Sequence, residues 1–126
     1  MEQYATIDSS GFPKVIISFK GNKADDANFT TYLEKTKALY DKKQKLSITF
    51  DATHATIPAL KYQKQQADWL KDNRALMEDY CKGTAYVIPN PIIRNVLKAI
   101  FALQKQPVPY KTVSSLDEAA AWVKTL

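Results

Sequence analysis

The order of strand-like and helix-like segments constrains the fold of this chain more than any other feature of its sequence. Residues 4–7 and 15–19 have strand-like patterns, and the turn-forming residues 8–13 separate them. Two strands this close along the chain are expected to pair as an antiparallel hairpin. After them, helical and strand patterns alternate to the last residues, which is typical of a parallel sheet with right-handed crossovers. We therefore predict an α/β fold with a mixed, mostly parallel five-stranded sheet, an N-terminal antiparallel hairpin and four helices.

Short polar side chains and prolines mark where the predicted helices begin. Asn90 followed by Pro91 combines a capping side chain with a proline at the first helical position. Ser115 and Glu118 have the spacing of a capping box. Pro58 suits the first turn of a long helix that extends to residue 80. The predicted strands are residues 4–7, 15–19, 46–50, 84–88 and 108–113, and the helices begin near residues 25, 58, 91 and 115.

Length and residue counts exclude several classes of protein. The chain has 126 residues, the usual size of one domain, so we predict a single domain over residues 1–126. Its one cysteine, Cys81, excludes an internal disulfide framework and a multi-cysteine metal site. Its one histidine, His54, excludes sites that need two imidazoles. We expect no metal and no cofactor.

The basic charge of the chain does not have the character of a nucleic-acid-binding surface. The formal net charge is +5, but only Arg74 and Arg94 are arginines. Base readout and bidentate phosphate contacts favour arginine, whereas lysine acts mainly as a solvated point charge. The lysines between residues 35 and 45 suit the last turn of a helix and the loop after it. We expect no nucleic-acid partner.

No segment has the pattern of a targeting peptide or a membrane span. The N-terminal residues lack a basic region followed by an apolar stretch. Residues 91–103 are the longest apolar-rich segment, and Arg94, Asn95 and Lys98 interrupt them. We expect a cytoplasmic protein without stable membrane insertion.

The loop after the third predicted strand is the first candidate site. Asp51 ends that strand, and Thr53, His54 and Thr56 follow. Ligands of open α/β sheets bind beyond the carboxyl ends of the strands, so this loop is where we expect a small ligand or a partner. The alternative is that Asp51 and Thr53 cap loop amides, with Thr53 or Thr56 capping the next helix. We expect no catalysis, because no nucleophile motif and no phosphate-binding glycine loop is present.

The helix predicted from Pro91 to about residue 105 carries the other candidates. Asn90 and Arg94 lie at its start, where an anion can bind, and the alternative, a cap and a solvated arginine, is the simpler explanation. Its apolar stripe is wider than one face needs. Either a deep groove in the core receives the excess, or the end with Phe101 and Leu103 contributes to a partner or self-association surface. A membrane surface is the lesser option.

Three features resemble the bacterial SpoIIAA-like proteins, relatives of STAS and SEC14-type domains. They are the hairpin followed by alternating units, the strand end Phe50-Asp51-Ala52-Thr53, and the tail of residues 112–123, Thr-Val-Ser-Ser-Leu-Asp-Glu-Ala-Ala-Ala-Trp-Val. Together they cover nearly the whole chain.

The resemblance implies a non-enzymatic regulatory or protein-interaction module. Anti-sigma factor antagonists of this type carry a phosphorylatable serine after the Asp strand, whereas residues 53–58 here contain neither Ser nor Gly. SEC14-type lipid carriers are longer, with extra helices around the lipid. The alternative function is binding of a small ligand, a lipid or a nucleotide, in the crevice at the carboxyl ends of the strands.

Overall fold

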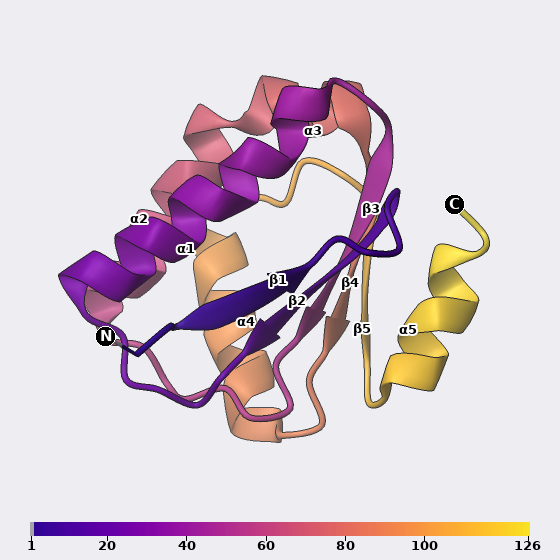
Figure 1. Ribbon diagram of the computed structural model, residues 1–126. Coiled ribbons are helices and arrows are strands. Elements are labelled where there is room, and N and C mark those ends of the chain that lie inside the picture. Colours follow the sequence, from indigo (N-terminus) through magenta and orange to yellow (C-terminus); the bar gives the residue numbers. More distant parts are fainter. Residues whose placement is uncertain (1) are drawn as a thin grey trace.

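The elements of the computed structural model, which describes residues 2–126, follow the predicted chain order (Figure 1). The strands are β1 (Ala5–Asp8), β2 (Lys14–Phe19), β3 (Leu46–Asp51), β4 (Cys81–Val87) and β5 (Tyr110–Val113). The helices are α1 (Asp26–Ala38), α2 (Leu60–Asp72), α3 (Arg74–Tyr80), α4 (Pro91–Leu103) and α5 (Leu116–Val123), and a 3₁₀ helix, Leu39–Lys42, follows α1.

The five strands form one mixed sheet in the order β1-β2-β3-β4-β5. β1 and β2 are antiparallel, with Ala5 opposite Phe19, and every other neighbouring pair is parallel. The predicted α/β fold is therefore confirmed, together with its hairpin and its mostly parallel sheet. β5 lies at an edge, as its flanking prolines indicate.

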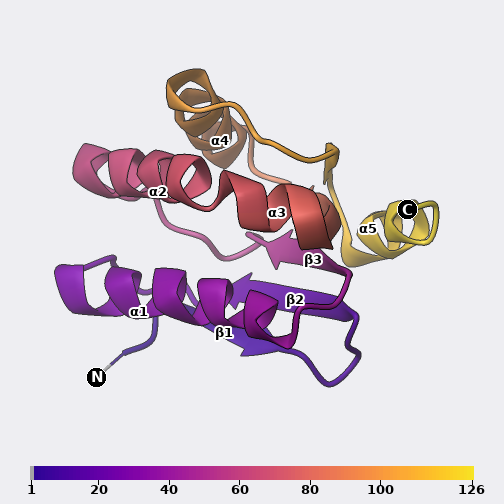
Figure 2. The same ribbon diagram turned by 90° about the horizontal axis from the view of Figure 1, so that it is seen from above.

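The helices cover the two faces of the sheet unequally (Figures 1 and 2). The helices α1 to α4 lie on one face, and α5 lies on the other, against β4 and β5. This follows from the topology, because each crossover moves the chain by one strand in the same direction. Crossovers of one hand then place every connecting helix on the same face. Only the helix after the last strand is free to cover the other side.

The structure has five α-helices where four were predicted. The expected long helix from residue 58 to residue 80 is two helices, α2 and α3, which meet at Asn73. Asn73 leaves the helical region with a ψ of 17°, and its side-chain amide donates to the Trp69 carbonyl oxygen at 2.9 Å. An asparagine that bonds its own backbone competes with the helical ladder, which accounts for the interruption.

Helix starts agree with the sequence where a side-chain cap is present. The Asn90 carboxamide oxygen accepts from the Ile92 amide at 2.8 Å, and Pro91 is the first residue of α4. Ser115 caps α5 by accepting from the Glu118 amide at 3.2 Å. The expectation of a threonine cap for α2 is wrong, since its N-cap is Ala59, which forms no side-chain cap bond.

Helix α4 directs its apolar stripe toward the sheet and leaves the flanks in solvent. Ile93 and Ile100 are buried, and Phe101 is half-buried. Ile92 and Leu103 remain 57% and 53% exposed. The wide apolar stripe is therefore partly core and partly surface.

Candidate functional site

The loop that follows β3 is held together by its own polar groups. The Asp51 carboxylate accepts from the Thr53 amide at 3.1 Å and from the Thr53 hydroxyl at 2.6 Å. The Thr56 hydroxyl donates to the Asn22 carbonyl oxygen at 3.4 Å, and the His54 side chain is exposed. This is the arrangement of a tied turn, and it matches the structural alternative for Asp51 and Thr53.

A glycine allows this loop to approach the loop that leaves β2. Gly21 has a φ of +83°, a backbone conformation that glycine adopts without strain. A Cβ at Gly21 would lie 3.1 Å from the His54 carbonyl oxygen. The loops after β2 and β3 are thus in contact at the carboxyl end of the sheet.

The second predicted group also forms bonds within the fold. Arg94 donates from Nε to the Ile88 carbonyl oxygen at 2.6 Å and from Nη2 to the Ser114 hydroxyl at 3.0 Å. It therefore links the segments that follow β4 and β5. With Asn90 used as the cap of α4, both residues serve the structure locally.

The most distinctive feature of the molecule is an apolar cavity between the sheet and the helices α1, α2 and α4. Its volume is about 100 Å³. None of the residues that line it is charged, and most of the aromatic side chains of the chain contribute to its wall. Of the seven predicted site residues, Thr56 and Phe101 lie in this wall, and Asp51, Thr53, His54, Asn90 and Arg94 do not.

Aromatic rings from three neighbouring strands form the sheet side of the cavity. Phe50 of β3 stacks on Phe19 of β2, with ring centroids 6.2 Å apart, and on Tyr86 of β4 at 5.1 Å. The interplanar angles are 14° and 8°. Phe101 of α4 meets Tyr86 edge-on at 5.7 Å. Each of these rings therefore packs against at least one other ring of the same wall.

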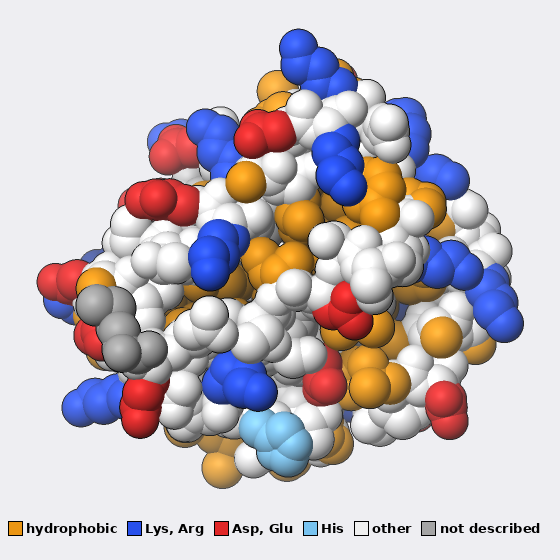
Figure 3. Space-filling view, viewed as in Figure 1, with side chains coloured by type: hydrophobic (Ala, Val, Ile, Leu, Met, Phe, Trp, Pro, Cys, Tyr) orange, Lys and Arg blue, Asp and Glu red, His pale blue; other side chains and the backbone are white. Residues whose placement is uncertain are grey.

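Two surface grooves share lining residues with the cavity. Tyr4 and Tyr32 also line a groove between α1 and β1, where Figure 3 shows hydrophobic side chains reaching the surface. Leu97 and Phe101 also line a groove of about 340 Å³ beside β5. The side chains of these four residues therefore separate the cavity from the two grooves.

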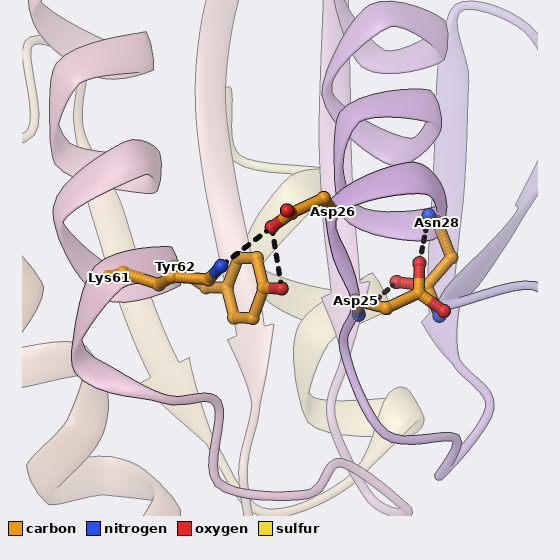
Figure 4. Close-up of polar contacts among 5 residues, drawn as sticks. All are labelled: Asp25, Asp26, Asn28, Lys61 and Tyr62. Atoms are coloured by element: carbon orange, nitrogen blue, oxygen red, sulfur yellow. Dashed lines mark hydrogen bonds and ion pairs between the residues drawn. The ribbon is translucent and has the colours of Figure 1, made fainter.

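Polar contacts at the surface join α2 to the first turn of α1. Asp26, in the first turn of α1, receives the Lys61 ammonium at 2.8 Å and the Tyr62 hydroxyl at 2.8 Å, and Figure 4 shows both contacts. The hydrogen bond from Lys61 lowers the pKa of the Asp26 carboxyl most, and the hydrogen bond from Tyr62 lowers it further. The neighbouring capping box, in which Asp25 and Asn28 exchange hydrogen bonds at 2.7 and 2.8 Å, holds the start of α1 rigid (Figure 4).

The buried tyrosines are neutral hydrogen-bonding groups. Burial raises the pKa of Tyr4 to about 12. Burial also raises the pKa of Tyr32, Tyr40 and Tyr86. Every one of these phenols therefore keeps its proton at neutral pH and can donate it.

Cys81 belongs to the core. It is 6% exposed, its thiol donates to the Gly83 carbonyl oxygen at 3.5 Å, and burial raises its pKa. A raised pKa disfavours the reactive thiolate. Over residues 2–126, no three side chains of His, Cys, Asp or Glu gather in a group able to hold a metal ion. Within the same residues, no helix has the length and apolar character needed to cross a membrane.

Of the aromatic residues in the cavity wall, only Phe101 was a candidate from the sequence. Trp69 and the tyrosines of the wall were not among the candidate residues. The available signal was the number of tyrosines at apolar positions of the predicted helices and strands, including Tyr32, Tyr40 and Tyr86. A tyrosine brings a hydroxyl that needs a partner into the interior, whereas phenylalanine fills a core without one.

Comparison with known proteins identifies no relative, because no protein-family model, no curated protein and no solved structure matches the chain.

Proposed function

We propose that this protein binds a small apolar ligand between its helical layer and its sheet, without chemical turnover. The observation that carries the proposal is the apolar, aromatic-lined cavity of about 100 Å³. Small-molecule sites are concave and mostly apolar, with a few placed polar groups, and this cavity has that composition.

The stability cost of the cavity supports this function. At about 24 cal/mol per Å³, a cavity of 100 Å³ lowers the free energy of unfolding by about 2 kcal/mol. Larger side chains at a few lining positions would recover that free energy if the space served no purpose. A bound apolar ligand recovers it as well, because it restores the missing contacts.

The lining selects between the two ligand classes expected from the sequence. A nucleotide phosphate needs cations or several amide donors, and no charged side chain lines the cavity. An apolar molecule or a lipid chain needs neither. Ala52 and Ile88, which follow β3 and β4, belong to the lining, so the cavity reaches the crevice where the ligand was expected.

The size of the cavity limits what enters without movement. An apolar cavity of about 150 Å³ holds benzene or xenon in other proteins. Xenon therefore fits here directly, and a benzene-sized ring needs a small outward movement of α2 or α4. A longer ligand requires α2 to separate further from its neighbours.

The test is methyl NMR of the isoleucines that line the cavity during titration with xenon and with toluene. Ile48, Ile88 and Ile100 are expected to show saturable shifts with each probe. Val96→Phe fills space in the lining and is expected to weaken toluene binding at least tenfold. The matched control, Ile92→Phe on the exposed side of α4, is expected to leave binding unchanged. Absence of saturable shifts, or equal binding by both variants, would contradict the proposal.

A second function, the regulatory or protein-interaction role implied by the SpoIIAA-like resemblance, is favoured by one surface. Leu103 and Tyr110 are 53% and 47% exposed, and Phe101 and Tyr110 line the groove beside β5. We propose self-association through this edge as the alternative. Light scattering over a concentration series tests it: a mass that rises with concentration in the wild type and stays monomeric in Leu103→Ser supports it. A wild type that is monomeric throughout would rule it out.

A further inference from the structure

Two buried polar atoms within residues 2–126 have no hydrogen-bond partner, and both lie near β4. They are the Tyr40 hydroxyl, which has the thiol of Cys81, a weak acceptor, beside it, and the Gln106 carboxamide oxygen. Tyr40 is 2% exposed and Gln106 is 4% exposed. Tyr40 lines the cavity, and Gln106 donates to two residues that also line it, Thr84 and Tyr86. A buried polar group without a partner is costly, so each one calls for an explanation.

The bonds of Gln106 leave the Tyr86 hydroxyl proton free. The Gln106 amide donates one proton to the Thr84 hydroxyl oxygen and one to the Tyr86 hydroxyl oxygen, the latter at 3.0 Å. Burial raises the Tyr86 pKa most, and a hydrogen bond from the Thr84 hydroxyl lowers it, so the Thr84 proton is used while the Tyr86 proton is kept for another acceptor. This part of the wall therefore has two donors, the hydroxyls of Tyr40 and Tyr86, and the Gln106 carboxamide oxygen is an unpaired acceptor beside them.

Two other polar groups of the lining differ, because their bonds are already formed. The Tyr32 hydroxyl donates to the Gln66 carboxamide oxygen at 2.9 Å, and the Thr36 hydroxyl donates to the Tyr32 carbonyl oxygen at 2.8 Å. Among the buried side-chain atoms of residues 2–126, those without a partner thus belong to Tyr40 and Gln106, at the β4 side of the cavity. Burial keeps the phenols of Tyr40 and Tyr86 protonated through a raised pKa.

We propose that the ligand is an uncharged apolar molecule with one hydroxyl-type oxygen, which the Tyr40 hydroxyl binds in the cavity. This inference rests on the proposed function and names its ligand class. The oxygen accepts the proton of Tyr40, and the Tyr86 hydroxyl, which Gln106 holds, is a second donor in the lining of the same cavity. A carboxylate is excluded as the preferred group, because no cation lines the cavity to offset the desolvation of a charge.

The experiment compares toluene, phenol and benzoate as probes, by the NMR titration described above, on the wild type and two variants. Toluene and phenol have nearly the same shape and differ by a methyl against a hydroxyl group. Tyr40→Phe is expected to weaken phenol binding about fivefold, the effect of one hydrogen bond, and to leave toluene binding unchanged. Tyr32→Phe is the matched control, since its hydroxyl already serves Gln66, and it is expected to leave the ratio of the two affinities unchanged. Benzoate is expected to bind at least tenfold more weakly than phenol at pH 7.

The outcomes separate the two proposals. If toluene binds and Tyr40→Phe changes the affinities for phenol and toluene equally, or changes neither, the hydroxyl preference is wrong while the proposed function stands. A bound water that permanently satisfies Tyr40 would give this result. Benzoate binding as tight as that of phenol also overturns the preference for an uncharged ligand. If none of the probes, xenon included, shifts the lining methyls, the proposed function itself fails.

Discussion

The two faces of the sheet are packed in opposite ways. The face under α5 is built from small side chains, Ala85, Val87, Val113, Ala119 and Val123, and the pocket of about 170 Å³ at its edge has three lysines, Lys14, Lys82 and Lys124, in its lining. The face under α1, α2 and α4 is built from large aromatic rings and leaves a cavity. Small side chains allow close approach of backbones, whereas large rings meet at angles and leave gaps. We infer that the face under α5 mainly stabilises the fold, whereas the face under α1, α2 and α4 holds the proposed ligand site.

The largest expected effect comes from enlarging the cavity. Ile48 is 1% exposed and lines it, so Ile48→Ala is expected to lower the free energy of unfolding by about 2–5 kcal/mol. The added space should also accept toluene more readily, and saturating toluene is expected to restore part of the lost stability. Chemical denaturation with and without toluene measures both effects.

The matched change for that experiment lies on the α5 face. Val87→Ala also removes buried apolar volume, at a residue that is 1% exposed, but beneath α5. Toluene is expected to restore none of its lost stability. Equal rescue of the two variants would show that the difference between the faces does not decide where a ligand binds.

The next effect comes from adding volume to each face. Ala85 is fully buried in the close-packed face, so Ala85→Leu is expected to destabilise the protein by about 1–3 kcal/mol through overpacking. Val96→Phe, which extends into the cavity, is expected to leave stability unchanged or to raise it. Thermal unfolding of both variants measures the difference. A similar loss of stability in Ala85→Leu and Val96→Phe would mean that the two faces of the sheet are packed equally tightly.

A smaller effect on the free energy of unfolding is expected at two tyrosines on the face that holds the cavity. Tyr32→Phe removes a hydrogen bond to Gln66 and is expected to cost about 1 kcal/mol. Tyr40→Phe removes a hydroxyl that has no partner and is expected to cost nothing or to stabilise the protein slightly. Urea denaturation distinguishes them. A loss at Tyr40 as large as that at Tyr32 would mean that the Tyr40 hydroxyl is satisfied in solution.

The smallest effect concerns the polar contacts that hold α2 to α1. Lys61 and Tyr62 lower the pKa of Asp26, so the folded state binds the Asp26 proton less tightly than the unfolded state does. The stabilisation is therefore fully present above the ordinary carboxyl pKa of 3.8 and is lost as the pH falls through the lowered value. Because the pair is exposed, the stability difference between the wild type and Asp26→Asn is expected to be small at pH 7 and to vanish in acid.

The Asp26→Asn variant also tests whether toluene enters between α1 and α2. Loosening α2 opens only the face that holds the cavity, so toluene is expected to exchange faster with Asp26→Asn than with the wild type at pH 7. Line-shape analysis of the Ile48 methyl resonance measures this exchange. An unchanged exchange rate would mean that toluene enters by another route, such as the groove beside β5.

Local interactions explain why most of the fold was predictable. The start of α4 depends on Asn90 and Pro91, and the start of α5 depends on Ser115, all within a few residues of the helices they begin. The alternation of elements implied the parallel sheet, since a crossover connection leaves few other arrangements. Residues that form bonds with distant parts of the chain were predicted less well. Thr56, considered as a possible cap, instead bonds the Asn22 carbonyl oxygen in another loop.

The sequence by itself determined the class of the fold, its N-terminal hairpin and the apolar stripe of α4, because periodicity, caps and turns act over short stretches of chain. Only the tertiary structure decided that Phe19, Phe50 and Tyr86 stack across three strands, and that a cavity remains beside them. Whether side chains fill a space depends on the summed volumes and angles of residues from every element around it. No local pattern contains that sum, and for this reason the proposed ligand site, in the wall of the core, is largely separate from the loop where polar residues had indicated a site.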